Sequence, residues 1–184
     1  MIETERLILR PFTADDAADL YEYLKEPGAH CFTEMKLASP QDAEEEIKRR
    51  MNDELYFAIV PKDVNRAVGE IFVHSEPNER KDMPDDTFFL CWMLNLKYSG
   101  RGYAYEAASA VFDYLFRNRG ARRIYAYADE DNLRSRHLCE KLGMRQEGIF
   151  LEYVSFVSNP DGTPHYENTY QFALLRSEWE KMHS

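Results

Sequence analysis

Residues 87–118 read TFFLCWMLNLKYSGRGYAYEAASAVFDYLFRN and indicate the fold more directly than any other segment. Its first part, 87–96, is a long apolar run, which is typical of a central strand covered on both faces. From Ala104 onward, apolar residues recur at helical spacing, which predicts a helix over 102–118. Gly120 then marks the end of that helix. The stretch therefore predicts a buried strand that turns directly into an amphipathic helix.

The turn between the two elements is Lys97-Tyr98-Ser99-Gly100-Arg101-Gly102. Glycines let a ligand approach the backbone without a Cβ in the way. The start of the following helix adds unpaired N–H groups and a partial positive charge. With Lys97 and Arg101 alongside, the turn predicts a site for a phosphate or pyrophosphate. The alternative is that the two glycines serve only the conformation of the turn.

Known phosphate-binding motifs narrow the choice of anion. The P-loop pattern G-x-x-x-x-G-K-[ST] is absent from the sequence. The dinucleotide pattern G-x-G-x-x-[G/A] is matched by Gly100 and Gly102 but then meets Tyr105. This mismatch speaks against a nucleotide-binding oxidoreductase, which we keep as an alternative.

Outward from this stretch, strands and helices alternate without a repeat or a linker that would divide the chain. This order predicts one mixed α/β (α+β) domain over residues 1–184. The other predicted strands are 6–10, 55–60, 67–73, 122–128, 145–157 and 165–175. The other predicted helices are 14–25, one starting at Ser39-Pro40, 133–142, and a short tail at Glu178-Trp179.

Composition bounds the class of partner. The 184 residues carry 23 Lys and Arg against 33 Asp and Glu, so the net charge is 23 − 33 = −10. An acidic domain is a poor candidate for binding nucleic acid or an anionic membrane, and it suits cationic small molecules or basic peptide ends. The alternative is that the acidic residues serve only to keep the protein soluble.

Cysteine, histidine and apolar patterns exclude other classes. Cys31, Cys91 and Cys139 form no C-x-x-C pair, and the five histidines form no metal-ligand spacing, so we predict no metal site. The odd number of cysteines favours a reducing, cytoplasmic setting. The charged start lacks the apolar region of a signal peptide, and no run approaches the roughly 18 apolar residues of a membrane span.

The turn resembles the acyl-CoA-binding signature of the GNAT superfamily of N-acetyltransferases, Q/R-x-x-G-x-G/A, with Lys97 in place of Gln or Arg. The resemblance extends to the RimJ/RimL-like branch through segments that follow in order over residues 3–179. These are ETERLILRPFTADDAADLY (3–21), WMLNLKYSGRGYAYEA (92–107), DNLRSRHLCEKLGMRQEG (131–148) and YQFALLRSEW (170–179).

The resemblance implies a GNAT-like acyl-CoA acyltransferase fold. Its central sheet is mostly antiparallel and seven-stranded, is flanked by about four helices, and is splayed between the fourth and fifth strands. In this chain those strands are 87–96 and 122–128. The resemblance also implies acetyl-CoA as co-substrate, without a metal.

The resemblance assigns residues to acetyl-CoA. The pantetheine arm would pair with the backbone around Met93, Leu94 and Leu96. Asn132 would hydrogen-bond the same arm, and its alternative role is a turn residue and helix cap. The pyrophosphate would lie on the turn and the first residues of the helix, namely Lys97, Ser99, Gly100, Arg101, Gly102, Tyr103 and Ala104.

The implied reaction is direct transfer of an acetyl group to a primary amine: a protein N-terminus, a polyamine, an amino acid or another small amine. Many family members protonate the leaving thiolate with a Tyr where this chain has Leu138-Cys139. Ser135 is our candidate acid, with cofactor contact or helix capping as its other roles. Cys139 is a weaker candidate, because a buried Cys more often packs in the core.

For the general base we consider two glutamates. Glu70 lies in the apolar strand AVGEIFV, where a cleft would raise its pKa or a water chain would connect it to the acceptor. Strand alternation would alternatively send Glu70 to solvent. Glu106 is the second choice, with a structural role as its alternative. An α-amine acceptor, with a pKa of about 7.7–8.0, would need no base.

No motif in the sequence identifies the amine acceptor. Glu34, Glu152 and Tyr153 are candidates for the acceptor side, as are the loops 26–39, 75–86 and 157–165. Dimerisation is common in this branch, so a homodimer is an expectation that no sequence feature fixes. Because the usual Tyr is missing, a non-catalytic acetyl-CoA-binding module remains the alternative to an enzyme.

Overall fold

The computed structural model describes residues 1–184. Its strands are β1 (Ile2–Glu3), β2 (Leu7–Arg10), β3 (Tyr56–Pro61), β4 (Gly69–Glu76), β5 (Thr87–Leu94), β6 (Arg123–Asp129), β7 (Arg145–Ser158) and β8 (Pro164–Leu175). Its α-helices are α1 (Ala17–Leu24), α2 (Pro40–Met51), α3 (Tyr103–Asn118), α4 (Leu133–Lys141) and α5 (Arg176–Met182). Short 3-10 helices cover Ala14–Asp16 (η1), His30–Met35 (η2) and Leu96–Tyr98 (η3).

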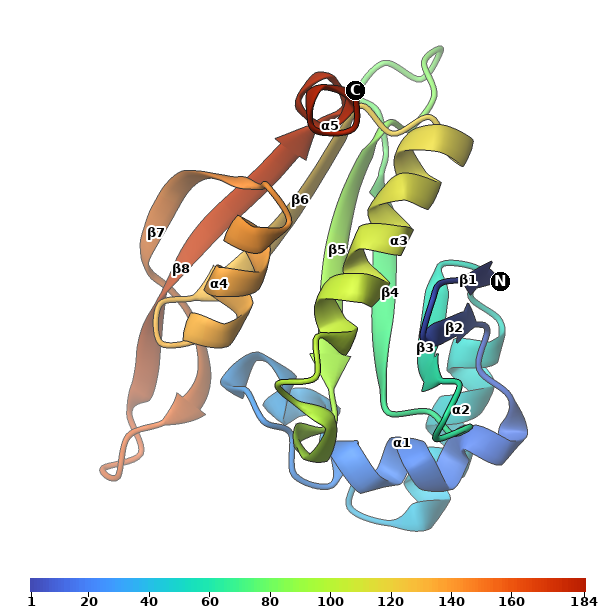
Figure 1. The fold of residues 1–184 in the computed structure, drawn as a ribbon. Coiled ribbons are helices and arrows are strands. Elements are labelled where there is room, and N and C mark those ends of the chain that lie inside the picture. Colours follow the sequence, from blue (N-terminus) through green and yellow to red (C-terminus); the bar gives the residue numbers. More distant parts are fainter. The chain divides into compact units, whose positions relative to one another are not determined.

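The chain divides into two compact units. The first unit holds Met1–Phe72 and Trp92–Ala108, and the second holds Val73–Cys91 and Ser109–Ser184. Strands β4 and β5 and helix α3 each contribute residues to both units. The strands follow the sheet order β1-β2-β3-β4-β5-β6-β8-β7 (Figure 1).

The first unit is built on antiparallel pairs, β1 with β2, β2 with β3, and β3 with β4. All six residues of β3 are buried. Helix α2 starts sharply because Ser39 and Asp42 form a capping box ahead of Pro40: the Asp42 amide donates to Ser39 Oγ over 3.2 Å, and the Ser39 amide donates to Asp42 Oδ2 over 2.9 Å. These elements bury an aliphatic core that includes Leu7, Leu9, Leu20, Leu24, Ile47, Ile59 and Ile71.

The second unit contains the parallel pair and the long hairpin. β5 and β6 are parallel over only three residues each, Thr87–Phe89 and Arg123–Tyr125, while β6 continues along β8 as far as Asp129. Helix α4 lies over β6 (Figure 1). On helix α5, Trp179 stacks on Phe116 with ring centroids 5.2 Å apart, and its indole N–H donates to Asp113 over 2.9 Å.

The structure confirms the predicted class, a mixed α/β GNAT-like fold, and differs in its details. It has eight strands rather than seven and five α-helices rather than about four. The extra strand, β1, is two residues long and is fixed by pairing with β2, which a periodicity cannot show. The predicted strand 87–96 ends at Leu94, because the Asn95 side chain caps the 3-10 helix at Leu96–Tyr98. The 3-10 helix His30–Met35 falls in a predicted loop. No helix has the length and apolar character needed to cross a bilayer.

Candidate functional site

The turn after β5 has the geometry of an anion cradle. Gly100 and Gly102 both adopt left-handed backbone conformations, with φ of +77° and +81°. A Cβ built on Gly100 would meet no atom within 4 Å, so the turn is open on that side. Helix α3 begins at Tyr103, and the Glu106 amide donates over 3.1 Å to Gly102 O. The amides ahead of Glu106 are therefore those that a helix leaves to capping groups or ligands.

Arg6, which the sequence analysis did not single out, braces this turn within the first unit. Its Nη1 donates to the carbonyl oxygen of Arg101 over 3.0 Å, and its guanidinium lies 5.2 Å from the ring centroid of Tyr103. A Cβ on Gly102 would lie 3.3 Å from Arg6 Nη2. The Arg6 guanidinium therefore packs against the turn and is hydrogen-bonded to one of the turn's carbonyl oxygens.

Glu106 holds Arg6 in place. Its carboxylate accepts from the Arg6 amide over 2.9 Å, from Arg6 Nε over 2.6 Å and from the Thr4 hydroxyl over 2.6 Å. Burial by itself raises the pKa of Glu106, but the hydrogen bonds from Thr4 and Arg6 outweigh it and the pKa is lowered. These contacts suit the structural alternative for Glu106.

The two predicted cationic side chains of the turn have other partners. Lys97 Nζ lies 2.5 Å from Glu22 Oε1 on α1, and it lowers the pKa of Glu22 by this hydrogen bond. The Arg101 guanidinium lies 5.3 Å from the ring centroid of Tyr98. Both residues are exposed, so either can turn toward an anion after a weak surface contact is given up.

The end of β5 approaches β4 closely at Gly69, another residue that the sequence analysis did not single out. A Cβ on Gly69 would lie 2.4 Å from Met93 O and 2.9 Å from Leu94 Cα. Glycine is therefore required for the backbones to come this close. The signal was present in the sequence, because an isolated glycine within a strand pattern indicates a bulge or a close approach. Met93 is buried, Leu94 is half-buried and Leu96 is exposed.

Glu70 lies inside the first unit with 0% of its surface exposed, so the alternative that it faces solvent is wrong. Its carboxylate pairs with the Arg50 guanidinium, which is also fully buried. The hydroxyl of Tyr23 donates to it over 2.7 Å, and that of Tyr56 over 3.2 Å. Burial raises the pKa of Tyr23, which keeps this donor protonated. Without exposed surface, Glu70 reaches an acceptor only through another group.

Three of the predicted residues of the second unit lie on or beside helix α4. Asn132 caps helix α4, since its Oδ1 accepts from the Ser135 amide over 3.1 Å. Ser135 is half-buried in the first turn of that helix. Cys139 is fully buried, and burial raises the pKa of its thiol to about 12. A buried, protonated thiol packs in the core, as its alternative role predicted.

The structure thus gathers one group of predicted residues in the first unit, namely Glu70, Met93, Leu94, Leu96, Lys97, Ser99, Gly100, Arg101, Gly102, Tyr103 and Ala104. Asn132 and Ser135 form a separate pair at the start of α4. No group of three or more His, Cys, Asp or Glu side chains is arranged to hold a metal ion.

Comparison with known proteins identifies the family. Residues 6–145 match the family model of the acetyltransferase (GNAT) domain. An uncharacterized N-acetyltransferase of Bacillus subtilis, YnaD, is 28% identical over 179 residues, which cover 97% of this chain and 98% of YnaD.

Solved structures agree with the family model. The crystal structure of a GNAT-family acetyltransferase from Bacillus anthracis is similar with a TM-score of 0.81 and 28% identity, over 96% of this chain and 98% of that one. A mutant of the spermidine N-acetyltransferase SpeG from Vibrio cholerae shares the fold, with a TM-score of 0.75 and 17% identity over 98% and 100% of the two chains. No match supports a non-catalytic binding module. The chain belongs to the GNAT family and is an N-acetyltransferase, an acyltransferase whose family uses acetyl-CoA as co-substrate.

Proposed function

We propose that this enzyme holds acetyl-CoA on the turn between β5 and α3 and transfers the acetyl group directly to a primary amine. The observation that carries the proposal is the pair of left-handed glycines, Gly100 and Gly102, at the start of the 16-residue helix α3. Unpaired amides at a helix start and a side of the turn without a Cβ suit a pyrophosphate.

Acetyl-CoA supplies the activated acetyl thioester, and the residues of the turn bind its other parts. The amides from Gly100 to Ala104 hold the pyrophosphate, with Arg101 and Lys97 as neutralising cations. The Ser99 amide, which was expected to join them, donates instead to the carbonyl oxygen of Leu96 over 3.1 Å. The backbone of Met93, Leu94 and Leu96 pairs with the pantetheine arm. The approach of Gly69 to Met93 fixes the position of that strand end.

In the reaction the amine nitrogen forms a bond to the thioester carbonyl carbon, and the carbon–sulfur bond breaks. An alkylammonium, with a pKa near 10.4, must first lose a proton, and the departing thiolate gains one. Ser135 is the proposed donor to the thiolate and Asn132 a proposed contact of the pantetheine arm. Glu70 is the proposed base only through a hydrogen-bonded chain, because its carboxylate is buried. An α-amine acceptor would dispense with it.

The acceptor that we propose is a cationic primary amine in the cytoplasm, and the branch that we propose is RimJ/RimL-like. The net charge of −10 supports a cationic acceptor. The shared fold with a spermidine N-acetyltransferase is consistent with it. The three cysteines form no disulfide, which suits a reducing compartment.

Calorimetric titration with CoA tests the turn. We expect Gly102→Val to fold and to lose CoA affinity, because a side chain at a φ of +81° strains the turn, crowds Arg6 Nη2 and intrudes on the cradle. Gly120→Val is the matched control: Gly120 also has a positive φ, +70°, with open space around it, but follows the far end of α3. Equal CoA affinity in Gly102→Val and the parent protein would refute the assignment.

A further inference from the structure

The second unit contains a cluster of aromatic rings on three strands, which we call the aromatic cluster. Its members are Phe89 of β5, Tyr125 and Tyr127 of β6, and Phe150 and Tyr153 of β7. Neighbouring ring centroids are 4.9–6.2 Å apart, from the Phe150–Tyr153 pair to the contacts of Tyr127 with both. The register explains part of the cluster, since Phe89 pairs with Tyr125, and Tyr127 follows two residues later on the same face.

An irregularity in β7 completes the cluster. Phe150 and Tyr153 are three residues apart and would point to opposite faces of a regular strand. Instead, both rings contact Tyr127. Between them the register with β8 shifts, so that residues 151–153 stand opposite Asn168 alone.

The conformation of this bulge is held in place. Glu152 adopts a φ of +48°, an unfavourable conformation for a residue with a side chain. Its amide donates to Asn168 Oδ1 over 2.9 Å, and Asn168 Nδ2 donates to Glu130 over 2.8 Å. Bulges of this kind redirect side chains and are frequent beside functional sites. The register shift at this bulge brings the Tyr153 ring beside that of Phe150 on one face.

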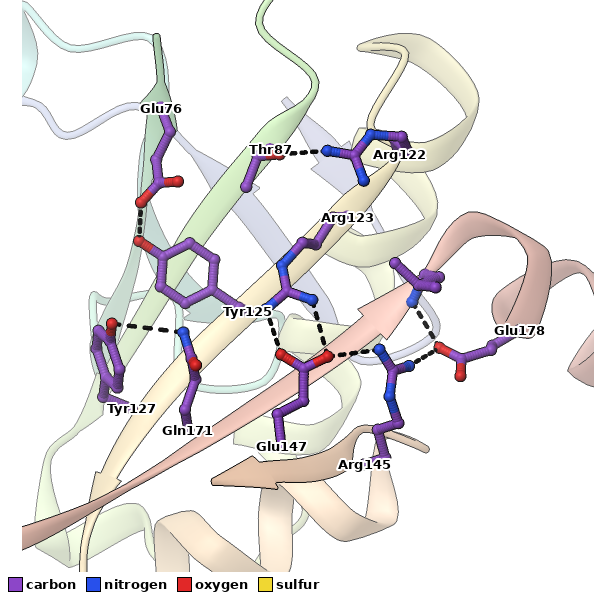
Figure 2. Close-up of polar contacts among 11 residues, drawn as sticks. Glu76, Thr87, Arg122, Arg123, Tyr125, Tyr127, Arg145, Glu147, Gln171 and Glu178 are labelled. Carbon is purple, nitrogen blue, oxygen red and sulfur yellow. Dashed lines mark hydrogen bonds and ion pairs between the residues drawn. The ribbon is translucent and has the colours of Figure 1, made fainter. Parts of the chain in front are cut away.

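The aromatic cluster is partly exposed to solvent, and the carboxylate of Glu76 contacts one of its tyrosines. Tyr153 is 50% exposed and Phe150 38%, which is unusual for two large rings in contact. Glu76 accepts a hydrogen bond from the Tyr125 hydroxyl (Figure 2). Burial raises the pKa of Tyr125, and the hydrogen bond to Glu76 raises it further, so this hydroxyl stays protonated and remains a donor.

The neighbouring cations are already neutralised. The Arg123 guanidinium lies 5.8 Å from the Tyr125 ring centroid and pairs with Glu147, which also pairs with Arg145 (Figure 2). Arg145 pairs in turn with Glu178. With Glu76 included, these groups carry three negative and two positive charges, so the surroundings favour a further cation.

We propose that the aromatic cluster and Glu76 bind an alkylammonium group of the amine acceptor. The inference rests on the proposed function, since it names the residues that would recognise the acceptor. Ring faces attract cations, and the Glu76 carboxylate supplies a counter-charge, since the nearby Arg123, whose charge it stabilises, is ion-paired with Glu147. The Glu76 carboxylate would repel an anionic ligand, and a purely apolar ligand would bury its negative charge without a counter-charge.

The test compares 1,5-diaminopentane, which keeps a second ammonium while the first amine reacts, with pentylamine, which does not. Release of free thiol from acetyl-CoA is the signal. We expect Tyr153→Leu to raise the KM for the diamine about fivefold or more with little change in kcat. Tyr153→Phe keeps the ring and should resemble the parent enzyme. Glu76→Gln should raise the KM for the diamine and not for pentylamine.

Tyr166→Leu is the matched control, because Tyr166 is an equally exposed tyrosine of the same hairpin, at 56%, outside the cluster. An unchanged KM for the diamine in Tyr153→Leu and Glu76→Gln, with normal thiol release, would refute the cluster and leave the proposed function standing. If neither amine releases thiol although CoA binds, calorimetry with the diamine alone decides. A heat of diamine binding that the parent protein shows and Tyr153→Leu does not would support binding at the aromatic cluster. If the parent protein shows no heat of binding, the proposal is refuted.

Discussion

Glu70 and Arg50 form an ion pair without any contact with solvent. Removing two charges from water is costly unless their hydrogen bonds are satisfied. The hydroxyls of Tyr23 and Tyr56 add donors to the carboxylate, whereas Arg50 Nη2 is buried without a hydrogen-bond partner. Arg50 also pairs with Glu46 over 2.9 Å and lies 4.8 Å from the Tyr56 ring centroid. The carboxylate is thus a fixed part of the packing of α1, α2 and β4.

We expect Glu70→Gln to destabilise the protein by roughly 3–5 kcal/mol, because it leaves the buried Arg50 charge without its main partner. Denaturant unfolding measures this loss. Glu46→Gln is the control, since Glu46 contacts the same guanidinium but is 22% exposed, and its loss should be smaller. Unchanged stability of Glu70→Gln would contradict this structural role. An altered pH–rate profile of the folded variant would separately support the proposed role of Glu70 as general base.

The junction of β5 and α3 is stabilised by Arg6, a residue outside the glycine turn. The sequence predicts the glycine turn and the helix because both signals are local: a paired glycine and a sustained apolar period. The brace of Arg6 and Glu106 joins residues 100 positions apart, and no local pattern indicates it. For the same reason the partners of Glu70 were not foreseen, since they come from α1, α2 and β3.

Strand β7 shows a different limit of sequence prediction. Its extent was predicted almost to the residue, as 145–157 against Arg145–Ser158. Its bulge was not, because a bulge breaks the period of two on which strand prediction depends. The sequence therefore indicates Tyr153 as a candidate for the acceptor side, but it does not indicate that the ring contacts Phe150 and Tyr127.

The brace at the start of α3 should make stability depend on pH. The pKa of Glu106 is lowered in the folded protein, so its contribution is present above its ordinary value of 4.5 and is lost as pH falls through the folded value. We expect Glu106→Gln to be less stable than the parent at pH 7, and the difference to shrink below about pH 4.5. Unfolding in denaturant at pH 7 and near pH 3.5 measures this. The exposed Glu45→Gln serves as control; a difference that is equal at both pH values would contradict the brace.

Over the full chain, a net charge of −10 coexists with a predicted anion site. The cations near the turn are few, and Lys97 is already paired with Glu22. Affinity for the pyrophosphate must therefore come mainly from backbone amides and Arg101, which act at short range. The surplus of carboxylates acts at long range, and it attracts a cationic amine while it repels CoA.

Salt should separate these two effects. The screening length falls from about 10 Å at 0.1 M to about 3 Å at 1 M, so long-range attraction is lost first. Between roughly 0.05 and 0.5 M NaCl we expect the KM for 1,5-diaminopentane to rise several-fold. The Kd for CoA should change less, because screening weakens both the repulsion by the surface and the attraction by Arg101. Thiol release and calorimetry give the two values, with sucrose at matched osmolarity as control. A KM for the diamine that stays constant or falls with salt would show that the acidic surface does not serve the acceptor.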